Sequence, residues 1–288
     1  MVALMTCLLI VLSSGCSSDF GISMRLAGRE EGEDTLSSCE LSLKSANSND
    51  AESVDGLQFM FRKIAAQRAQ QHWLGVAEYC SGRFAEGTMS SALAGYRHYL
   101  LANQQDDSAS PHSSLAEDGL NESELSDLGF DSSSISSAES SAIALAEDRS
   151  GFALEILAAR NGNDAGLLAL SDNQKAVAQT FVSVHPNASD PRQKVYSVTN
   201  LLSHPQTIAD PANGLTAPTA ASVLMNCARA EIAAMTAARN ASAHPSSERL
   251  TRLVAELATL RAYQALKLGY PAFESALFVS KNAANSDN

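Results

Sequence analysis

Histidine is well suited to proton transfer near neutral pH and to metal ligation, and three histidines of this chain stand directly before a proline. They are His185, His204 and His244. The first two belong to a short repeat in which an Asp-Pro pair follows, at Asp190 and at Asp210. Three imidazoles brought together would form a metal site. Proline, however, disfavours helix in the preceding residue, and Asp is a good helix N-cap. We therefore predict that these pairs end and begin short helices and bind no metal.

Cysteines offer a second kind of chemistry. The chain has five, and three of them, Cys39, Cys80 and Cys227, lie beyond the N-terminal segment. Their spacing fits no zinc or iron–sulfur pattern. In an oxidising compartment, an odd number of cysteines leaves one thiol unpaired, or that thiol forms a disulfide with another molecule. We interpret Cys80 and Cys227 as small buried residues on helices, with a Cys80–Cys227 disulfide as the alternative.

Carboxylates are concentrated in segments that we predict to be disordered, where two acids cannot be held at the fixed separation that acid–base catalysis requires. Three glutamates, Glu155, Glu231 and Glu256, fall on predicted helices. They would be candidates to line a cleft, but we predict a surface position for each. The sequence also lacks the phosphate-loop, dinucleotide-binding, zinc-protease and nucleophile-elbow motifs. We therefore predict no catalytic residue and no cofactor, and we favour a binding protein over an enzyme.

The chain begins with an apolar run, residues 2–12, that ends in Ser13-Ser14-Gly15-Cys16. The run is shorter than the roughly 20 residues that span a bilayer. It resembles a bacterial lipoprotein signal peptide, whose cysteine becomes the first residue of the mature protein and carries fatty acyl groups such as palmitate. The resemblance covers about the first twenty residues and implies that Cys16 is lipidated. It departs from the family at Ser13, where leucine is usual, and in having no Lys or Arg before Leu12. The alternatives are an ordinary cleaved signal peptide or an apolar N-terminal helix.

Residues 17 and 18 are both Ser, and in the lipoprotein family the absence of Asp after the cysteine implies sorting to the outer membrane of a diderm bacterium. We therefore expect a signal peptide over residues 1–15 and a lipid-anchored protein that faces the periplasm or the cell surface. Residues 16–54 are rich in Ser, Asn, Glu and Asp, with little apolar periodicity. This composition predicts a flexible tether between the membrane and the body of the protein.

A helical hairpin is predicted over residues 55–103, because apolar residues recur at steps of three and four on both sides of Ser81-Gly82. From Leu74 to Ala94 it resembles one tetratricopeptide repeat, with a Leu-Gly pair at Leu74, a turn glycine at Gly82 and the close-packing alanine at Ala94. The resemblance implies a protein-binding α-solenoid. Gly87 departs from it, because the family has alanine there, and no second copy follows at a period of 34 residues. A plain helical hairpin is the alternative.

Residues 104–141 contain many Ser, Asp and Glu and no Lys or Arg, which predicts a disordered acidic insert. It is either a solvated loop, which we favour, or a binding arm with scattered apolar anchors. These anchors are Leu120, Leu125, Leu128, Phe130 and Ile135.

Residues 142–288 are predicted to form a helical domain. One helix should end near residue 161, and a capping box at Ser171 should open the next. Two longer helices should follow, the second beginning after Ser247 and ending at Gly269 as its C-terminal cap. A final helix is expected from Pro271. The fold class is therefore all-α: a helical hairpin plus a multi-helix domain, in the manner of an irregular α-solenoid.

The net charge of the chain argues against two kinds of binding partner. A net charge of −12 on 288 residues, without clustered Lys and Arg, argues against nucleic-acid binding. It also argues against adsorption to anionic lipid, so the lipid anchor is the expected membrane contact. We therefore predict a membrane-anchored scaffold that binds an envelope protein during assembly or secretion. The alternative is an envelope hydrolase that acts on cell-wall or polysaccharide material.

Overall fold

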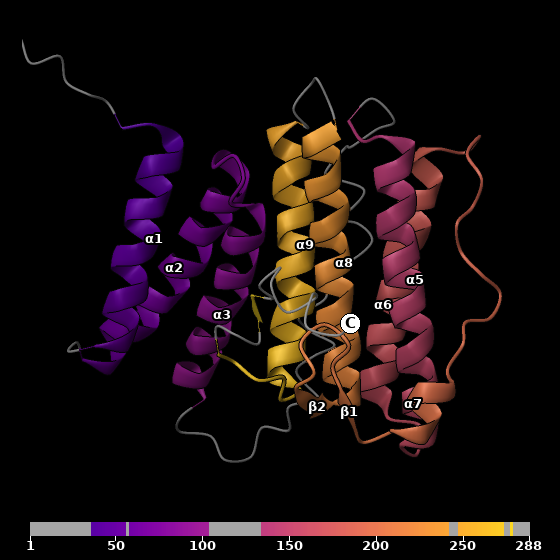
Figure 1. Ribbon diagram of the computed structural model, residues 1–288. Coiled ribbons are helices and arrows are strands. Elements are labelled where there is room, and N and C mark those ends of the chain that lie inside the picture. Colours follow the sequence, from indigo (N-terminus) through magenta and orange to yellow (C-terminus); the bar gives the residue numbers. More distant parts are fainter. Residues whose placement is uncertain (1–35, 56–57, 104–133, 242–246, 274–276, 279–288) are drawn as a thin grey trace, which may run out of the picture. The chain divides into compact units, whose positions relative to one another are not determined.

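The computed structural model describes residues 36–55, 58–103, 134–241, 247–273 and 277–278 (Figure 1). In this part of the chain the fold is all-α, as predicted, with one small antiparallel sheet. The helices are α1 (Ser38–Val54), α2 (Phe59–Tyr79), α3 (Phe84–Ala102), α5 (Ser137–Arg160), α6 (Ala165–Val184), α7 (Thr199–Ser203), α8 (Thr219–Ala241) and α9 (Glu248–Lys267). The strands are β1 (Thr207–Ala209) and β2 (Thr216–Pro218), with Thr207 opposite Pro218. Every helix in these described ranges is too short or too polar to cross a bilayer.

The long helices pack in an order that differs from their order in the sequence. α1 packs on α2, α2 on α3, α3 on α9, α9 on α8, α8 on α5 and α5 on α6. Figure 1 accordingly shows α9 and α8 between α3 on one side and α5 on the other. α9 also contacts α2, so the hairpin and the later helices share one hydrophobic core. The predicted boundary between a hairpin and a separate helical domain therefore does not divide this core.

Several helix ends follow from local sequence. Ser247 caps α9 by accepting a hydrogen bond from the Leu250 amide, and Gly269 ends that helix with a positive φ of 92°, as predicted. Capping boxes also begin α1 at Ser37 and α5 at Ser136. In each box the serine accepts the amide of a glutamate three residues later, and the glutamate accepts the serine amide.

The predicted flexible tether is wrong for residues 38–54, which form α1. The sequence of this helix has no clear apolar stripe, and only Ala46 and Ser53 are buried. Tertiary contacts hold the helix instead. Arg97 of α3 binds the Asp50 carboxylate and donates to Ser53 Oγ at 2.7 Å, and Arg62 of α2 donates to the Ser53 carbonyl at 3.1 Å. Residues 16–35 lie outside the described part.

The predicted insert is described only from residue 134 onwards. Residues 137–141 are the first turn and a half of α5, and Ile135, predicted as an anchor in this insert, is buried in the core. The insert prediction is therefore wrong at this end. Residues 104–133 lie outside the described ranges, as do Leu120, Leu125, Leu128 and Phe130.

The predicted helix start at Ser171 is also wrong, because α6 begins seven residues earlier, with Asp164 as its N-cap. Asp164 accepts the amides of Gly166 and Leu167, at 2.9 and 3.1 Å. Ser171 is buried in mid-helix and donates to the Gly151 carbonyl of α5 at 2.8 Å. The serine thus satisfies its hydroxyl across a helix contact rather than at a helix end.

The hairpin of α2 and α3 is present, and its closest approach explains the departure at Gly87. A Cβ at Gly87 would lie 2.4 Å from the Ala77 amide nitrogen and 2.7 Å from the Trp73 carbonyl oxygen. Two backbones therefore meet here, and alanine, the residue of the tetratricopeptide family, does not fit. The similarity of the hairpin to the tetratricopeptide family stays a prediction.

Candidate functional site

The three glutamates singled out from the sequence lie in two different environments. Glu155 on α5 is exposed and binds Lys175 at 2.5 Å, and Glu256 on α9 is partly exposed and binds Arg252 at 2.6 Å. Glu231 on α8 is fully buried. The predicted surface position is therefore correct for two of them and wrong for Glu231, because its face of α8 turns toward α5 and α9.

Glu231 belongs to a polar cluster inside the core, which we call the core cluster. α8 contributes Cys227 and Glu231, one helical turn apart, α5 contributes Glu147, and α9 contributes Arg261. All four side chains are at least 97% buried. Burial of charge at this depth is costly unless the charges are paired and hydrogen-bonded, so the arrangement of these groups decides whether the helices can pack.

Arg261 is held at three of its nitrogen atoms. Nε donates to Glu147 Oε1 at 2.9 Å, Nη1 donates to Gln264 Oε1 at 3.3 Å, and Nη2 donates to Asn173 Oδ1 at 3.1 Å. Gln264 lies on α9 and Asn173 on α6, so a single guanidinium links α5, α6 and α9. The ion pair with Glu147 has both partners fully buried.

The protonation of the core cluster follows from its burial. Burial raises the pKa of Glu231 well above its ordinary value, the nearby Glu147 carboxyl raises it further, and Arg261 offsets only part of this. Burial also raises the pKa of the Cys227 thiol, as do the charges of Glu147 and Glu231. For Arg261, burial lowers the pKa, but the two carboxyls more than compensate and raise it. Burial and the neighbouring carboxyl therefore favour the neutral form of Glu231 and of Cys227, whereas the two carboxyls favour the charged form of Arg261.

Two carboxylate oxygens of the core cluster, Glu147 Oε2 and Glu231 Oε2, are buried and have no hydrogen-bond donor among the described residues. Buried polar atoms usually have a hydrogen-bond partner, so these two oxygens are exceptions in the core.

A second buried network holds the small sheet against α8 and the end of α9. Asp210, in the turn between β1 and β2, is fully buried. It accepts hydrogen bonds from Arg229 at 2.8 Å, from the Ala212 amide at 2.8 Å and from the Tyr270 hydroxyl. Burial raises the pKa of Asp210, but the hydrogen bonds from Tyr270, Ala212 and Arg229 outweigh it and lower the pKa overall.

The histidines and aspartates of the repeat have structural roles. His185 and His204 are the C-caps of α6 and α7, as predicted, and their rings face the carbonyls of Ile135 and Asn200. The predicted helix starts at Asp190 and Asp210 are wrong, because Asp190 binds the amide and guanidinium of Arg192 in an irregular segment and Asp210 joins the buried network. His244 lies outside the described residues, as does the predicted lipidation residue Cys16.

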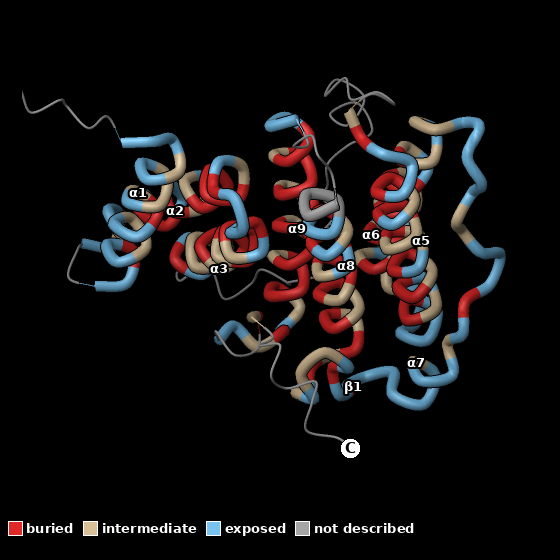
Figure 2. Tube along the Cα trace, turned by 45° about the horizontal axis from the view of Figure 1, so that its top comes forward, coloured by how far each residue is buried: buried red, intermediate tan, exposed pale blue. Residues whose placement is uncertain are grey.

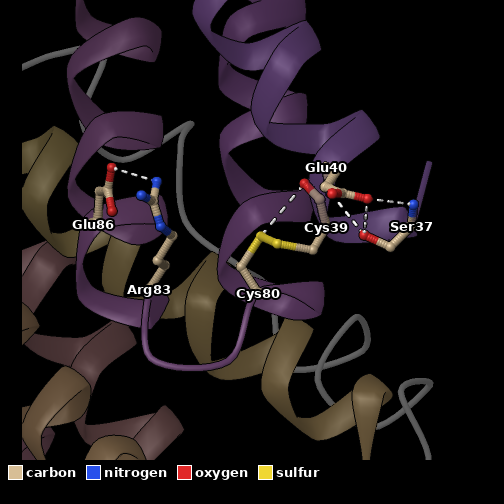
Figure 3. Close-up of a disulfide and its surroundings, with 6 residues drawn as sticks. All are labelled: Ser37, Cys39, Glu40, Cys80, Arg83 and Glu86. Atoms are coloured by element: carbon tan, nitrogen blue, oxygen red, sulfur yellow. Dashed lines mark hydrogen bonds and ion pairs between the residues drawn. A yellow bond between two sulfur atoms is a disulfide. The ribbon is translucent and has the colours of Figure 1, made fainter.

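The cysteines pair in a way that the sequence did not indicate. Cys39, in the first turn of α1, forms a disulfide with Cys80, the C-cap of α2 (Figure 3). Cys227 is a free buried thiol. The interpretation as a buried helical residue is confirmed for Cys227. Cys80 is buried, but it lies at the end of α2 and is bonded to Cys39, so the Cys80–Cys227 alternative is wrong. Position Cys39 fell in the predicted tether, where no fixed partner was expected.

An apolar groove lies between α1 and α2, with a volume of about 240 Å³. It is lined by Asn49, Glu52, Phe61, Ile64, Ala65 and Arg68. Phe61 is 56% exposed and Ile64 is 40% exposed, and the adjoining Met60 is 60% exposed. Figure 2 shows how much of α1 and the start of α2 is exposed in comparison with α9. Three large apolar side chains exposed within five residues form a patch of the kind that binds proteins or ligands.

Comparison of this chain with known protein families, with curated proteins and with solved structures finds no match.

Proposed function

We propose that this chain is a lipid-anchored protein of a bacterial envelope that binds another envelope protein through the groove between α1 and α2. The carrying observation is the groove itself, with Phe61 and Ile64 exposed in its wall and with Met60, next to Phe61 in the sequence, also exposed. Apolar side chains in water gain about 25 cal/mol for each Å² that a partner covers, so covering this patch would favour association.

The chemistry of the groove specifies the partner. Its α2 wall is apolar except for Arg68, which is exposed and has no ion pair with another described residue. Glu52, on the α1 wall, accepts from Ser48 at 3.1 Å. A partner segment with a large apolar side chain flanked by a carboxylate would fill the groove and pair with Arg68. The apolar contact would supply most of the affinity, because an exposed ion pair contributes little.

Two further features support the envelope location. Disulfides form and persist in oxidising compartments, and Cys39–Cys80 ties the groove helices together. The segment that ends at Cys16 resembles a lipoprotein signal peptide. The alternative, an envelope hydrolase, has less support, because Glu147 and Glu231 are buried where no polysaccharide can reach them.

Site-specific photo-crosslinking tests the groove. A photoreactive amino acid at Ile64 should trap a membrane-associated protein, whereas the same group at Val195, which is 70% exposed on another part of the chain, should not. The trapped product should disappear with Phe61→Ser or Arg68→Glu. Equal products from Ile64 and Val195, or products that survive Phe61→Ser, would contradict the proposal.

The anchor is tested separately. Cys16→Ser should abolish lipid labelling and release the chain from the membrane fraction, while the helical circular dichroism stays unchanged. Lipid labelling that persists in the Cys16→Ser chain would show that the attachment is at another residue.

A further inference from the structure

The core cluster has the donor set of a metal site. One ligand atom each from Glu147, Cys227 and Glu231 can be chosen so that all three lie within 4.8 Å of one another, and Cys227 Sγ lies 3.9 Å from Glu231 Oε1. Two ligands of one tetrahedral Zn²⁺ lie roughly 3.3–3.8 Å apart, given metal–ligand bonds of about 2.0–2.3 Å. Small side-chain rotations would close this difference. We propose that these three residues bind one divalent cation of the zinc class, which links α5 to α8.

The free oxygen atoms support this assignment. Glu147 has Oε1 on Arg261, while its Oε2 has no hydrogen-bond donor among the described residues. Glu231 likewise has Oε1 on the Cys227 thiol and leaves Oε2 without a donor. Each carboxyl thus keeps one oxygen for an ion.

The positive charge of Arg261 is compatible with a bound cation, because Arg261 donates to Glu147 Oε1 and leaves Glu147 Oε2 for the ion. Metal-binding carboxylates are commonly oriented by a hydrogen bond from a neighbouring side chain. Gln264 and Asn173 fix the guanidinium in turn, so Glu147 cannot rotate freely.

An ion needs Cys227 as a thiolate and Glu231 as a carboxylate, so a proton on either group is released to solvent as the ion binds.

The sulfur ligand selects the class of ion. Mg²⁺ and Ca²⁺ take oxygen ligands, whereas Zn²⁺ and Co²⁺ accept a thiolate together with carboxylates. The site is buried, so the ion would enter while the helices pack and would act as a structural link.

Cobalt provides the test, because a thiolate bound to Co²⁺ gives a charge-transfer absorption in the near ultraviolet. The full chain carrying Cys7→Ser and Cys16→Ser keeps Cys227 as its one thiol outside the disulfide. It is unfolded in urea without reductant, refolded with Co²⁺ and separated from free metal. We expect one retained Co²⁺ per chain, the thiolate band, and displacement of Co²⁺ by Zn²⁺.

Three variants of this chain locate the site. Cys227→Ser should remove the thiolate band. Glu231→Gln should weaken Co²⁺ retention by about tenfold or more, yet fold normally, because glutamine has nearly the size and shape of glutamate. Glu155→Gln, on the exposed face of α5, should bind like the parent. Failure of the parent chain to retain Co²⁺, retention without the thiolate band, or unchanged retention in folded Glu231→Gln would each overturn the proposal.

Discussion

Helices α1 and α9 are of similar length, but the chain holds them in place by different means. Of the 17 residues of α1 only two are buried, whereas 14 of the 20 residues of α9 are buried. α1 contacts α2 and is fastened by the Cys39–Cys80 disulfide and by Arg97. α9 lies between α3 and α8 and carries a fully buried charge, Arg261.

The difference shows what each position in the fold permits. A helix with neighbours on two sides finds partners for a buried guanidinium on α5 and α6, so a charge inside the core can be satisfied. A helix at the edge of the packing buries too little apolar surface to hold itself, and covalent and polar links replace the missing burial. The same edge position leaves the groove beside α2 open to a partner.

The largest effect is expected on the α9 side of this comparison. Arg261→Met leaves the buried Glu147 carboxylate without its partner and should cost about 3–5 kcal/mol in the free energy of unfolding. Urea denaturation measures it. Lys175→Met is the control, because it breaks the exposed pair with Glu155 and should cost less than about 1 kcal/mol. The double variant Glu147→Gln/Arg261→Met should recover much of the loss. If Arg261→Met lowered the free energy of unfolding as little as Lys175→Met, the buried ion pair would not stabilise the core.

The next effect is expected at α1. The disulfide joins residues 41 apart, and the loop-entropy relation gives about 4 kcal/mol for a loop of this length, as an upper value. Cys39→Ser/Cys80→Ser should therefore destabilise the chain by about 2–4 kcal/mol. Hydrogen exchange should accelerate first in α1 and remain slow in α9. Equal acceleration in the two helices would show that the disulfide does not stabilise α1 more than α9.

The network around Asp210 makes stability depend on pH. Its pKa is lower in the folded chain than in the unfolded chain, so its contribution is present above the unfolded value, about 3.9, and is lost as pH falls through the folded value. Asp210→Asn should cost about 1.5–3 kcal/mol at pH 7 and flatten the decline of the urea midpoint below pH 4. Asp172→Asn is the control, since this carboxylate lies on the exposed face of α6. An Asp210→Asn chain with the parent's acid dependence would assign that dependence to other groups.

The smallest expected effect compares two glycines of α3. Gly87→Ala places a methyl group against the backbone of α2 and should cost about 1–3 kcal/mol. Gly95→Ala meets only the end of the Gln70 side chain, at 3.1 Å, and should be neutral or slightly stabilising, because alanine is the better helix former. Thermal melting of the two variants measures the difference. Similar melting temperatures would show that α2 and α3 can separate at little cost.

Much of the helical layout could be predicted because it depends on local signals. The positions of α2, α3, α8 and α9, the Ser247 cap and the Gly269 end follow from apolar periodicity and from residues adjacent in sequence. The same reasoning failed at Ser171 and Asp210, whose side chains also suit helix caps. Ser171 donates to the Gly151 carbonyl of α5 instead, and Asp210 accepts from Arg229 of α8, from Tyr270 and from the Ala212 amide of its own turn.

The sequence by itself determined the all-α class, most helix boundaries and the segment that resembles a lipoprotein signal, because these are encoded within one or two helical turns. The tertiary structure decided the rest. It paired Cys39 with Cys80, turned Glu231 inward beside Glu147 and Arg261, and opened the groove at Phe61 and Ile64. The physical reason is separation along the chain: Glu147 and Arg261 are 114 residues apart, and only the packing of α5 against α8 and α9 brings them together.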